Sequence, residues 1–162
     1  MTKRILIIVA FVFGTISTIQ SQEVSKNALG VRFGDNDGFG AEVSYQRGLN
    51  SGDRLEFDLG WRDFDAGNAI KVTGLYQWIF NLDKGFNWYV GAGGGVGTID
   101  FDSNFPGGDD SDSFFFLAGD IGIEYNFDIP LLISLDLRPE IGFGDYNDDL
   151  DFDIGLGIRY QF

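Results

Sequence analysis

An all-β fold of eight antiparallel strands is predicted by three observations on the sequence. Apolar and polar residues alternate with a period of two in eight successive runs, which is the pattern of strands whose two faces meet different surroundings. Stretches rich in Gly, Asp and Asn separate most of these runs, as turns separate the strands of hairpins. No run with helical spacing follows the first 22 residues, so we expect no helix in the fold.

The first 22 residues have the pattern of a secretory signal. Lys3 and Arg4 precede a nine-residue apolar run, ILIIVAFVF, and the small and polar stretch GTISTIQSQ follows it. The apolar run is shorter than the ~20 residues that a membrane-spanning helix needs. We therefore expect residues 1–22 to be cleaved and residues 23–162 to form one domain. The loss of Lys3 and Arg4 changes the formal net charge from −14 to −16.

Four alternating runs are predicted in the first half of the mature chain. They span residues 27–34, 39–47, 53–64 and 69–80. In the first run Val31 and Phe33 flank Arg32, and the second and third runs repeat this alternation of apolar with charged or polar side chains. The turn stretches DNDG, GLNSG and DAGN connect the four runs. In the fourth run Leu75 and Ile79 interrupt the alternation.

Four more runs are predicted in the second half of the chain. They span residues 86–101, 113–127, 131–144 and 150–162. The fifth run carries a row of glycines on its polar face, namely Gly91, Gly93, Gly95 and Gly97. The eighth run alternates without interruption and ends on Phe162, and we expect its Asp151, Asp153 and Arg159 to face inward or toward the rim. NLDKG and DIP are tight turns, whereas the acidic stretch DSNFPGGDDSD is longer.

Eight amphipathic strands with short connections predict consecutive hairpins, and such a meander removes its free edges by closing into a barrel. Alternation alone fits two such barrels. One is a secreted soluble barrel with the apolar face inside around a small apolar ligand, as in lipocalin-like carriers, and the other is a transmembrane barrel with the apolar face toward lipid. The lengths of the runs suit the ~9–11 residues with which a tilted strand crosses a bilayer.

The charges on the polar face favour the transmembrane barrel. Both signs recur on nearly every run, so the charges can pair with one another inside a closed lumen, where an unpaired charge is costly. The candidate lumen charge network consists of Arg32, Glu42, Glu56, Asp58, Arg62, Lys71, Asp120, Glu124, Asp136, Arg138, Glu140 and Arg159.

The glycines and the aromatic residues favour the same orientation. A row of glycines gains nothing on a solvent face, but in a crowded lumen it makes room for long Arg and Lys side chains from neighbouring strands. Aromatic residues gather near the ends of the runs, where the aromatic girdles of membrane barrels lie. They are Phe39, Tyr45, Trp61, Trp78, Phe80, Trp88, Tyr125, Phe127, Tyr160 and Phe162. The predicted fold is therefore an all-β, eight-stranded antiparallel up-and-down transmembrane β-barrel.

From about Asn27 to Phe162 the chain resembles the OmpA/OmpX-type eight-stranded outer-membrane β-barrel family. The features that carry the resemblance are the signal, the eight alternating runs, the charged inner face and the final IGLGIRYQF. The resemblance implies a location in the bacterial outer membrane, with both termini in the periplasm. It also implies that Tyr160 and Phe162 form the C-terminal signal that the barrel assembly machinery recognises.

The same resemblance implies contacts with outer-membrane lipid and lipopolysaccharide, and a monomeric state. The loops after the odd-numbered strands, residues 35–38, 64–68, 102–112 and 145–149, are then expected on the outer side. Most of these loops are shorter than in adhesin-like members, which argues against adhesion. We expect a structural or surface role, or a minor permeability.

Catalysis and nucleic-acid binding are not expected. The chain contains neither Cys nor His, which excludes Ser-His and Cys-His catalysis and thiolate metal sites. Barrel enzymes of the outer membrane have a similar architecture, but their catalytic sets depend on histidine. The formal net charge of −14 and the scattered basic residues argue against a phosphate-binding surface. We therefore expect no enzymatic activity and no cofactor.

Two further motifs resemble ligand sites only in part. The stretch GAGGGVG does not fit the dinucleotide-binding pattern in any frame, and no βαβ unit surrounds it. Asp100 and Asp102 begin like a calcium loop, but Phe105 and Ser111 stand where an EF-hand needs Gly and Glu. We expect a solvated acidic loop here, and weak binding of a divalent cation is the alternative. The acids concerned are Asp100, Asp102, Asp109, Asp110 and Asp112.

Overall fold

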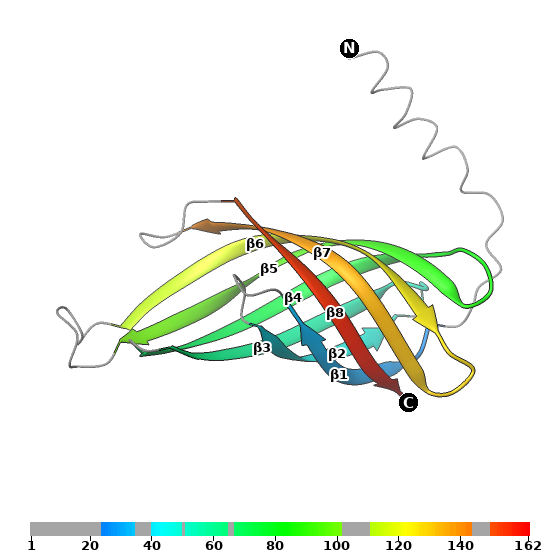
Figure 1. Ribbon diagram of the computed structural model, residues 1–162. Coiled ribbons are helices and arrows are strands. Elements are labelled where there is room, and N and C mark those ends of the chain that lie inside the picture. The colour runs from blue at the N-terminus through cyan, green and yellow to red at the C-terminus, as the bar shows by residue number, and fades with distance from the viewer. Residues whose placement is uncertain (1–23, 35–39, 50, 65–66, 102–110, 144–149) are drawn as a thin grey trace, which may run out of the picture.

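The computed structural model is a closed barrel of eight antiparallel strands (Figure 1), and it describes residues 24–34, 40–49, 51–64, 67–101, 111–143 and 150–162. The strands are β1 (Asn27–Phe33), β2 (Ala41–Gly48), β3 (Arg54–Phe64), β4 (Gly67–Asn81), β5 (Phe86–Phe101), β6 (Ser111–Asn126), β7 (Leu131–Phe143) and β8 (Leu150–Gln161). Each strand pairs with its neighbours in sequence, and β8 pairs with β1. These findings confirm the predicted up-and-down barrel.

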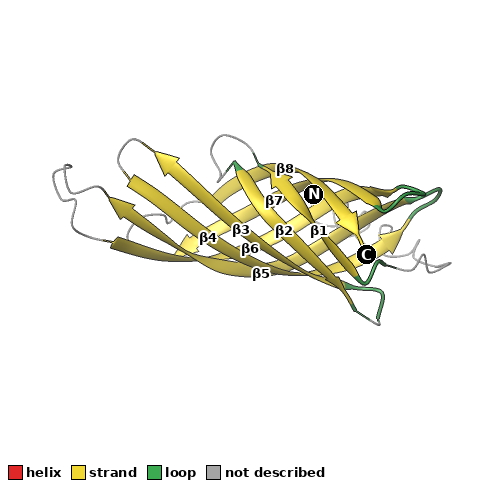
Figure 2. Cartoon of the chain, turned by 90° about the horizontal axis from the view of Figure 1, so that it is seen from below, coloured by secondary structure: helices red, strands yellow, loops and turns green. Residues whose placement is uncertain are grey.

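The seam between β1 and β8 brings both ends of the barrel chain together. The N–H of Asn27 donates to the Phe162 carbonyl at 3.1 Å, and the N–H of Phe162 donates to the Asn27 carbonyl at 2.9 Å. We call this end of the barrel the terminal end, and the opposite end the loop end. Tight turns close the hairpins at the terminal end, and in the β4–β5 turn Lys84 and Gly85 both have positive φ angles, of 54° and 89°. Figure 2 shows the tight turns and the C-terminus at one end of the elongated barrel.

The large apolar side chains cover the outer face. On β8 Ile154 is 56% exposed, whereas its neighbour Asp153 on the inner face is 9% exposed. On β5 the outward residues are apolar from Phe86 to Val96, and eleven residues at ~3.4 Å rise and ~40° tilt span about 26 Å. This height matches the apolar band of ~25 Å of transmembrane barrels. The soluble alternative requires the opposite orientation, with the apolar face inside.

Leu75 corrects one expectation about the alternation. It does not interrupt the pattern of β4, because its side chain lies in the lumen with 2% exposed, on the same face as Lys71, Thr73 and Gln77. The lumen therefore accepts apolar side chains as well as charged ones. The described residues contain no helix that is long and apolar enough to cross a membrane.

Candidate functional site

The candidate site is the lumen, where the alternation of all eight strands directs polar side chains. Twelve charged side chains have at most 9% of their surface exposed. They are Arg32, Glu42, Arg54, Glu56, Asp58, Lys71, Asp120, Glu124, Asp136, Arg138, Asp153 and Arg159. A buried charge is stable only where partners neutralise it, so their pairing decides what the lumen can do.

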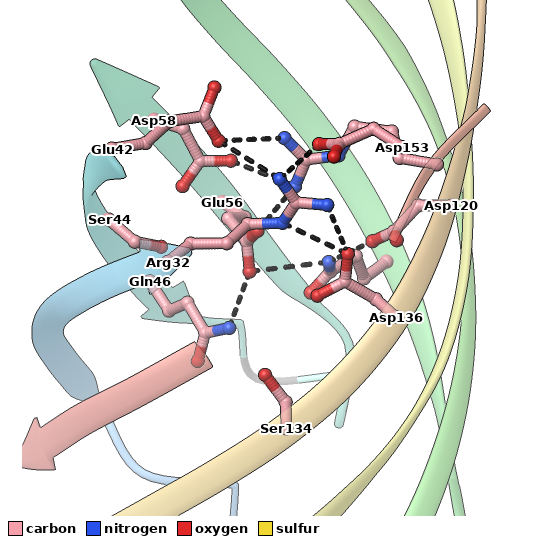
Figure 3. A network of polar contacts seen from close by, with 12 residues as sticks. Arg32, Glu42, Ser44, Gln46, Glu56, Asp58, Asp120, Ser134, Asp136 and Asp153 are labelled. Carbon is pink, nitrogen blue, oxygen red and sulfur yellow. Dashed lines mark hydrogen bonds and ion pairs between the residues drawn. The ribbon is translucent and has the colours of Figure 1, made fainter. Parts of the chain in front are cut away.

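Arg32 links β1 to three other strands. Its Nε and Nη2 donate to Asp136 Oδ1 at 2.9 and 2.5 Å, and its Nη1 donates to Asp153 Oδ2 at 2.6 Å and to Glu42 Oε2 at 3.2 Å. Figure 3 shows these carboxylates around the guanidinium group. The guanidinium of Arg32 is fully buried and contacts carboxylates from β2, β7 and β8. Arg32 therefore links the strands on both sides of the seam.

Glu56 of β3 is a second centre of contacts. Its Oε1 accepts from Arg138 Nη2 at 3.0 Å, while its Oε2 lies 3.2 Å from Arg159 Nη2 and accepts from Gln46 Nε2 at 2.5 Å. The same Arg138 nitrogen lies 2.9 Å from Asp58 Oδ2. We define the central cluster as three arginines and six carboxylates, namely Arg32, Arg138, Arg159, Glu42, Glu56, Asp58, Asp120, Asp136 and Asp153.

A separate ion pair lies on either side of the central cluster. Near the terminal end, Arg54 Nη1 lies 2.6 Å from Glu124 Oε2. Toward the loop end, Lys71 Nζ donates to both carboxylate oxygens of Glu140 at 2.7 and 2.8 Å. Each of these pairs joins one positive to one negative side chain, so each is balanced in charge.

An apolar plug of Leu75, Phe116 and Ala118 fills the part of the lumen beside Lys71, and Phe114 packs against it. Lys71 Nζ lies 4.8 Å from the centre of the Phe116 ring, which is a favourable cation–π distance. Together, the plug and the charged residues occupy most of the described interior, as expected of eight strands, and a small pocket lined in part by Gln46, Arg54 and Glu124 lies at the terminal end.

All but two of the residues in the predicted lumen network are buried in the lumen. Glu140 is half-buried and pairs with Lys71. Arg62 corrects the prediction: it lies on the inward face of β3 but is exposed. The reason is that β2 pairs with β3 only as far as Glu42, which lies opposite Gly60, so Arg62 stands beyond the stretch where the wall is closed on that side.

Two lumen charges lie outside the predicted network. Arg54 occupies the first position of β3 and shares a face with Glu56 and Asp58, so the alternation of the third run contained its signal. Asp153 was expected inward or at the rim, and the structure places it against Arg32. No sequence pattern indicated which carboxylate would meet which arginine.

The role of the β5 glycines also differs from the expectation. A Cβ atom on Gly95 would lie 2.4 Å from Cζ of Phe116, and one on Gly97 would lie 2.2 Å from Cζ of Phe114. These glycines therefore make room for aromatic rings from β6. The glycine that makes room for an arginine is on β8, where a Cβ on Gly155 would lie 2.3 Å from Cζ of Arg32.

Replacing Gly95 with alanine is expected to lower the free energy of unfolding by about 1–3 kcal/mol, because overpacking forces its neighbours apart. The added Cβ would meet the Phe116 ring at 2.4 Å and the Val72 carbonyl oxygen at 2.1 Å. Gly74→Ala is the matched control, since on the outer face of β4 its Cβ would lie 3.7 Å from the Phe57 ring, an ordinary contact. Urea unfolding followed by tryptophan fluorescence measures both, and equal effects would show that the Gly95 site is not crowded.

Aromatic side chains line the terminal end on the outer face of β4–β6. The rings of Phe80 and Trp88 stack with their centres 4.5 Å apart, and Tyr125 contacts Phe86 with ring centres 4.6 Å apart. On β8, Tyr160 and Phe162 are 59% and 61% exposed. Both rings of the expected C-terminal signal therefore point outward from the barrel.

Several expectations fall outside the described residues. They are the signal at residues 1–22, the aromatic Phe39, the outward loops at 35–38, 65–66, 102–110 and 145–149, and the acids Asp102, Asp109 and Asp110. The side chain of Asp112 is likewise not described, and Asp100 is exposed on β5. Within the described part of the chain, no three acidic side chains are grouped so as to hold a metal ion.

The solved structures that are similar to this barrel include the following three. Neisserial surface protein A has a TM-score of 0.59 and 12% identity, over 84% of this chain and 94% of that one. The N-terminal β-barrel domain of Pseudomonas aeruginosa OprF has a TM-score of 0.64 and 16% identity, over 86% and 100%. Ail, the attachment invasion locus protein of Yersinia pestis, has a TM-score of 0.57 and 20% identity, over 85% and 97%. No protein-family model and no curated protein sequence matches the chain.

Proposed function

Starting from the OmpA/OmpX-type eight-stranded barrel fold that the chain shares with these structures, we propose that it is a small monomeric integral protein of the bacterial outer membrane without catalytic activity. Its role is structural or at the cell surface, with at most a minor permeability. The observation that carries this proposal is the filled lumen beneath an apolar outer face. Arg32, Arg138 and Glu56 cross-link the interior by ion pairs, and Phe116 packs into the remaining space.

Membrane insertion is supported by the outer face. Its apolar side chains form a band of bilayer height, and aromatic rings follow at the terminal end. In solution this face would expose far more apolar area than monomeric soluble proteins tolerate. Lipid and lipopolysaccharide are the proposed contacts of this face, and the barrel assembly machinery is the proposed reader of Tyr160 and Phe162.

A minor permeability rather than a pore is supported by the lumen contacts. Arg32 alone joins β1 to carboxylates of three other strands, so an ion that passes must displace buried salt bridges. One of the proteins of similar fold is named a surface protein, and this supports a surface role for the chain.

The mature chain, residues 23–162, is expected to need detergent or lipid for a monomeric state and to migrate differently on gels before and after boiling. Folded transmembrane barrels keep their hydrogen-bonded wall in detergent until they are heated, which explains the shift. Fractionation of cells that express the full chain should place it with the outer membrane, and planar-bilayer recordings should show no large stable channel. A monomer that stays in buffer without detergent contradicts the membrane proposal, and a large channel contradicts the filled lumen.

A further inference from the structure

The central cluster contains more negative than positive side chains. Six carboxylates surround three arginines, and the two flanking pairs, Arg54–Glu124 and Lys71–Glu140, are already balanced. If every carboxylate were ionised, the cluster would carry three more negative than positive charges inside the barrel. Buried charges of this kind are strongly unfavourable unless they are neutralised.

The remaining Lys and Arg residues of the barrel do not balance this excess. The segments 35–39, 65–66, 102–110 and 144–149 contain neither Lys nor Arg. Lys26 and Lys84 are exposed, and Arg47 donates to Asn27 on the opposite face of the wall. Even if Arg62 were counted with the cluster, its carboxylates would outnumber its cations. The remaining neutralising charge therefore comes from solution, as a proton or as a small cation.

Asp120 is the member of the cluster with the weakest partners. Among the described residues no Arg or Lys nitrogen lies within ion-pair distance of its carboxylate, whereas each of the other five carboxylates has at least one such contact. Its Oδ2 accepts a hydrogen bond from the neutral amide of Gln77, and its Oδ1 has no hydrogen-bond partner. The residue is 3% exposed, so water outside the barrel does not screen this charge.

Asp136 offers a second unpartnered oxygen close by. Its Oδ1 accepts both hydrogen bonds from Arg32, while its buried Oδ2 has no hydrogen-bond partner. Asp120 and Asp136 are inward residues of the neighbouring strands β6 and β7, and their carboxylates repel each other electrostatically. Figure 3 shows both carboxylates on the same side of the lumen.

We propose that the central cluster binds a proton from solution on Asp120, with the unpartnered Oδ2 of Asp136 as its second acceptor. A proton rather than a metal ion fits the site, because the described residues hold no set of three acidic ligands that could chelate a metal. Two carboxylates that share a site are most stable when only one is ionised. A protonated Asp120 would be a hydrogen-bond donor beside an acceptor that lacks one.

The charge of Asp120 depends on groups from several strands. A titration of Asp120 must be interpreted together with all of these groups. These groups are Glu56 of β3, Gln77 of β4, Tyr89 of β5, and Asp136 and Arg138 of β7. Arg138 is the positive group among them, and Glu56 and Asp136 are the other carboxylates. The proposal rests on the closed lumen and can be tested in detergent micelles, independently of where the protein resides in the cell.

The decisive measurement is proton release when the mature barrel unfolds in urea at neutral pH, followed with an indicator dye. An aspartic acid that is protonated in the folded barrel ionises once it is exposed, so the wild type should release about one proton per chain more than Asp120→Asn. Infrared spectra of the folded wild type should also show a protonated carboxyl C=O band that Asp120→Asn lacks. Glu140→Gln is the control, because it removes a carboxylate that pairs with Lys71 outside the central cluster and should leave the band in place.

Asp120→Asn should keep the unfolding midpoint of the wild type, since an amide replaces a neutral acid of the same shape, whereas Glu140→Gln should lower it because Lys71 loses this carboxylate partner. If Asp120→Asn does not fold, the infrared band and the proton release of the wild type alone decide the question. Absence of the band, or equal proton release by both chains, overturns the proposal. A midpoint that changes at fixed pH when Na⁺ is replaced by K⁺ or by N-methylglucamine also overturns it, because the neutralising charge would then be an alkali cation.

Discussion

Replacing Arg138 with leucine is expected to lower the free energy of unfolding by about 3–5 kcal/mol, the cost of leaving buried charges without their partner. The guanidinium is fully buried and lies 3.0 Å from Glu56, 2.9 Å from Asp58 and 3.5 Å from Glu42. Leucine cannot neutralise these carboxylates, and the excess of negative charge in the central cluster would increase by one more.

Reversible urea unfolding in lipid vesicles measures this loss, with tryptophan fluorescence and gel mobility as two independent probes. Arg47→Leu is the control, because Arg47 donates to Asn27 away from the lumen and its loss should cost no more than about 1 kcal/mol. An Arg138→Leu variant as stable as the control would show that water reaches the central cluster and screens its charges.

Replacing Ile121 with arginine is expected to lower the free energy of unfolding in lipid vesicles by about 2–4 kcal/mol, the cost of a charge near the middle of the bilayer on the lipid face of a barrel. Ile121 is 48% exposed and lies between Val90 of β5 and Leu137 of β7 in the pairing of the wall. In water the same substitution would be almost neutral, since an exposed arginine is well solvated.

Ile129→Arg separates a lipid effect from a general effect of the new charge. Ile129 is 61% exposed in the turn between β6 and β7, beyond the apolar band, so arginine there should cost at most about 1 kcal/mol. Equal effects at the two positions would argue that the outer face does not contact hydrocarbon.

The strand architecture could be read from the sequence because both faces of each strand meet uniform surroundings. Leu150 to Phe162 shows this most clearly, since every outward side chain is apolar and the pattern has no alternative register that keeps charges off the outer face. The inner face is less uniform. Leu75 and Phe116 are apolar residues in the lumen, and their position depends on how side chains from β4, β5 and β6 fit together across the interior.

The functional details of the lumen depended on the register between strands, which the sequence pattern does not contain. The alternation places Arg62 on the inward face of β3. It is nevertheless exposed, because the pairing of β2 with β3 stops at Glu42 and Gly60. The β5 glycines were expected to accommodate Arg or Lys, and the rings of Phe114 and Phe116 occupy that space because β6 places them directly opposite. Alternation identifies the face of a residue, and only the three-dimensional pairing identifies its neighbour.

The seam between β1 and β8 has a consequence for the order of assembly. Asn27 and Phe162, which join there, are separated by 135 positions in the chain. Every hairpin between them can form from local contacts, but this last contact needs the whole chain and carries the largest loop-closure entropy. Until it forms, the nascent sheet has two open edges, which attract other strands. The completed chain is therefore prone to aggregation as long as its first and last strands are apart, and closure of the seam ends this exposure of strand edges.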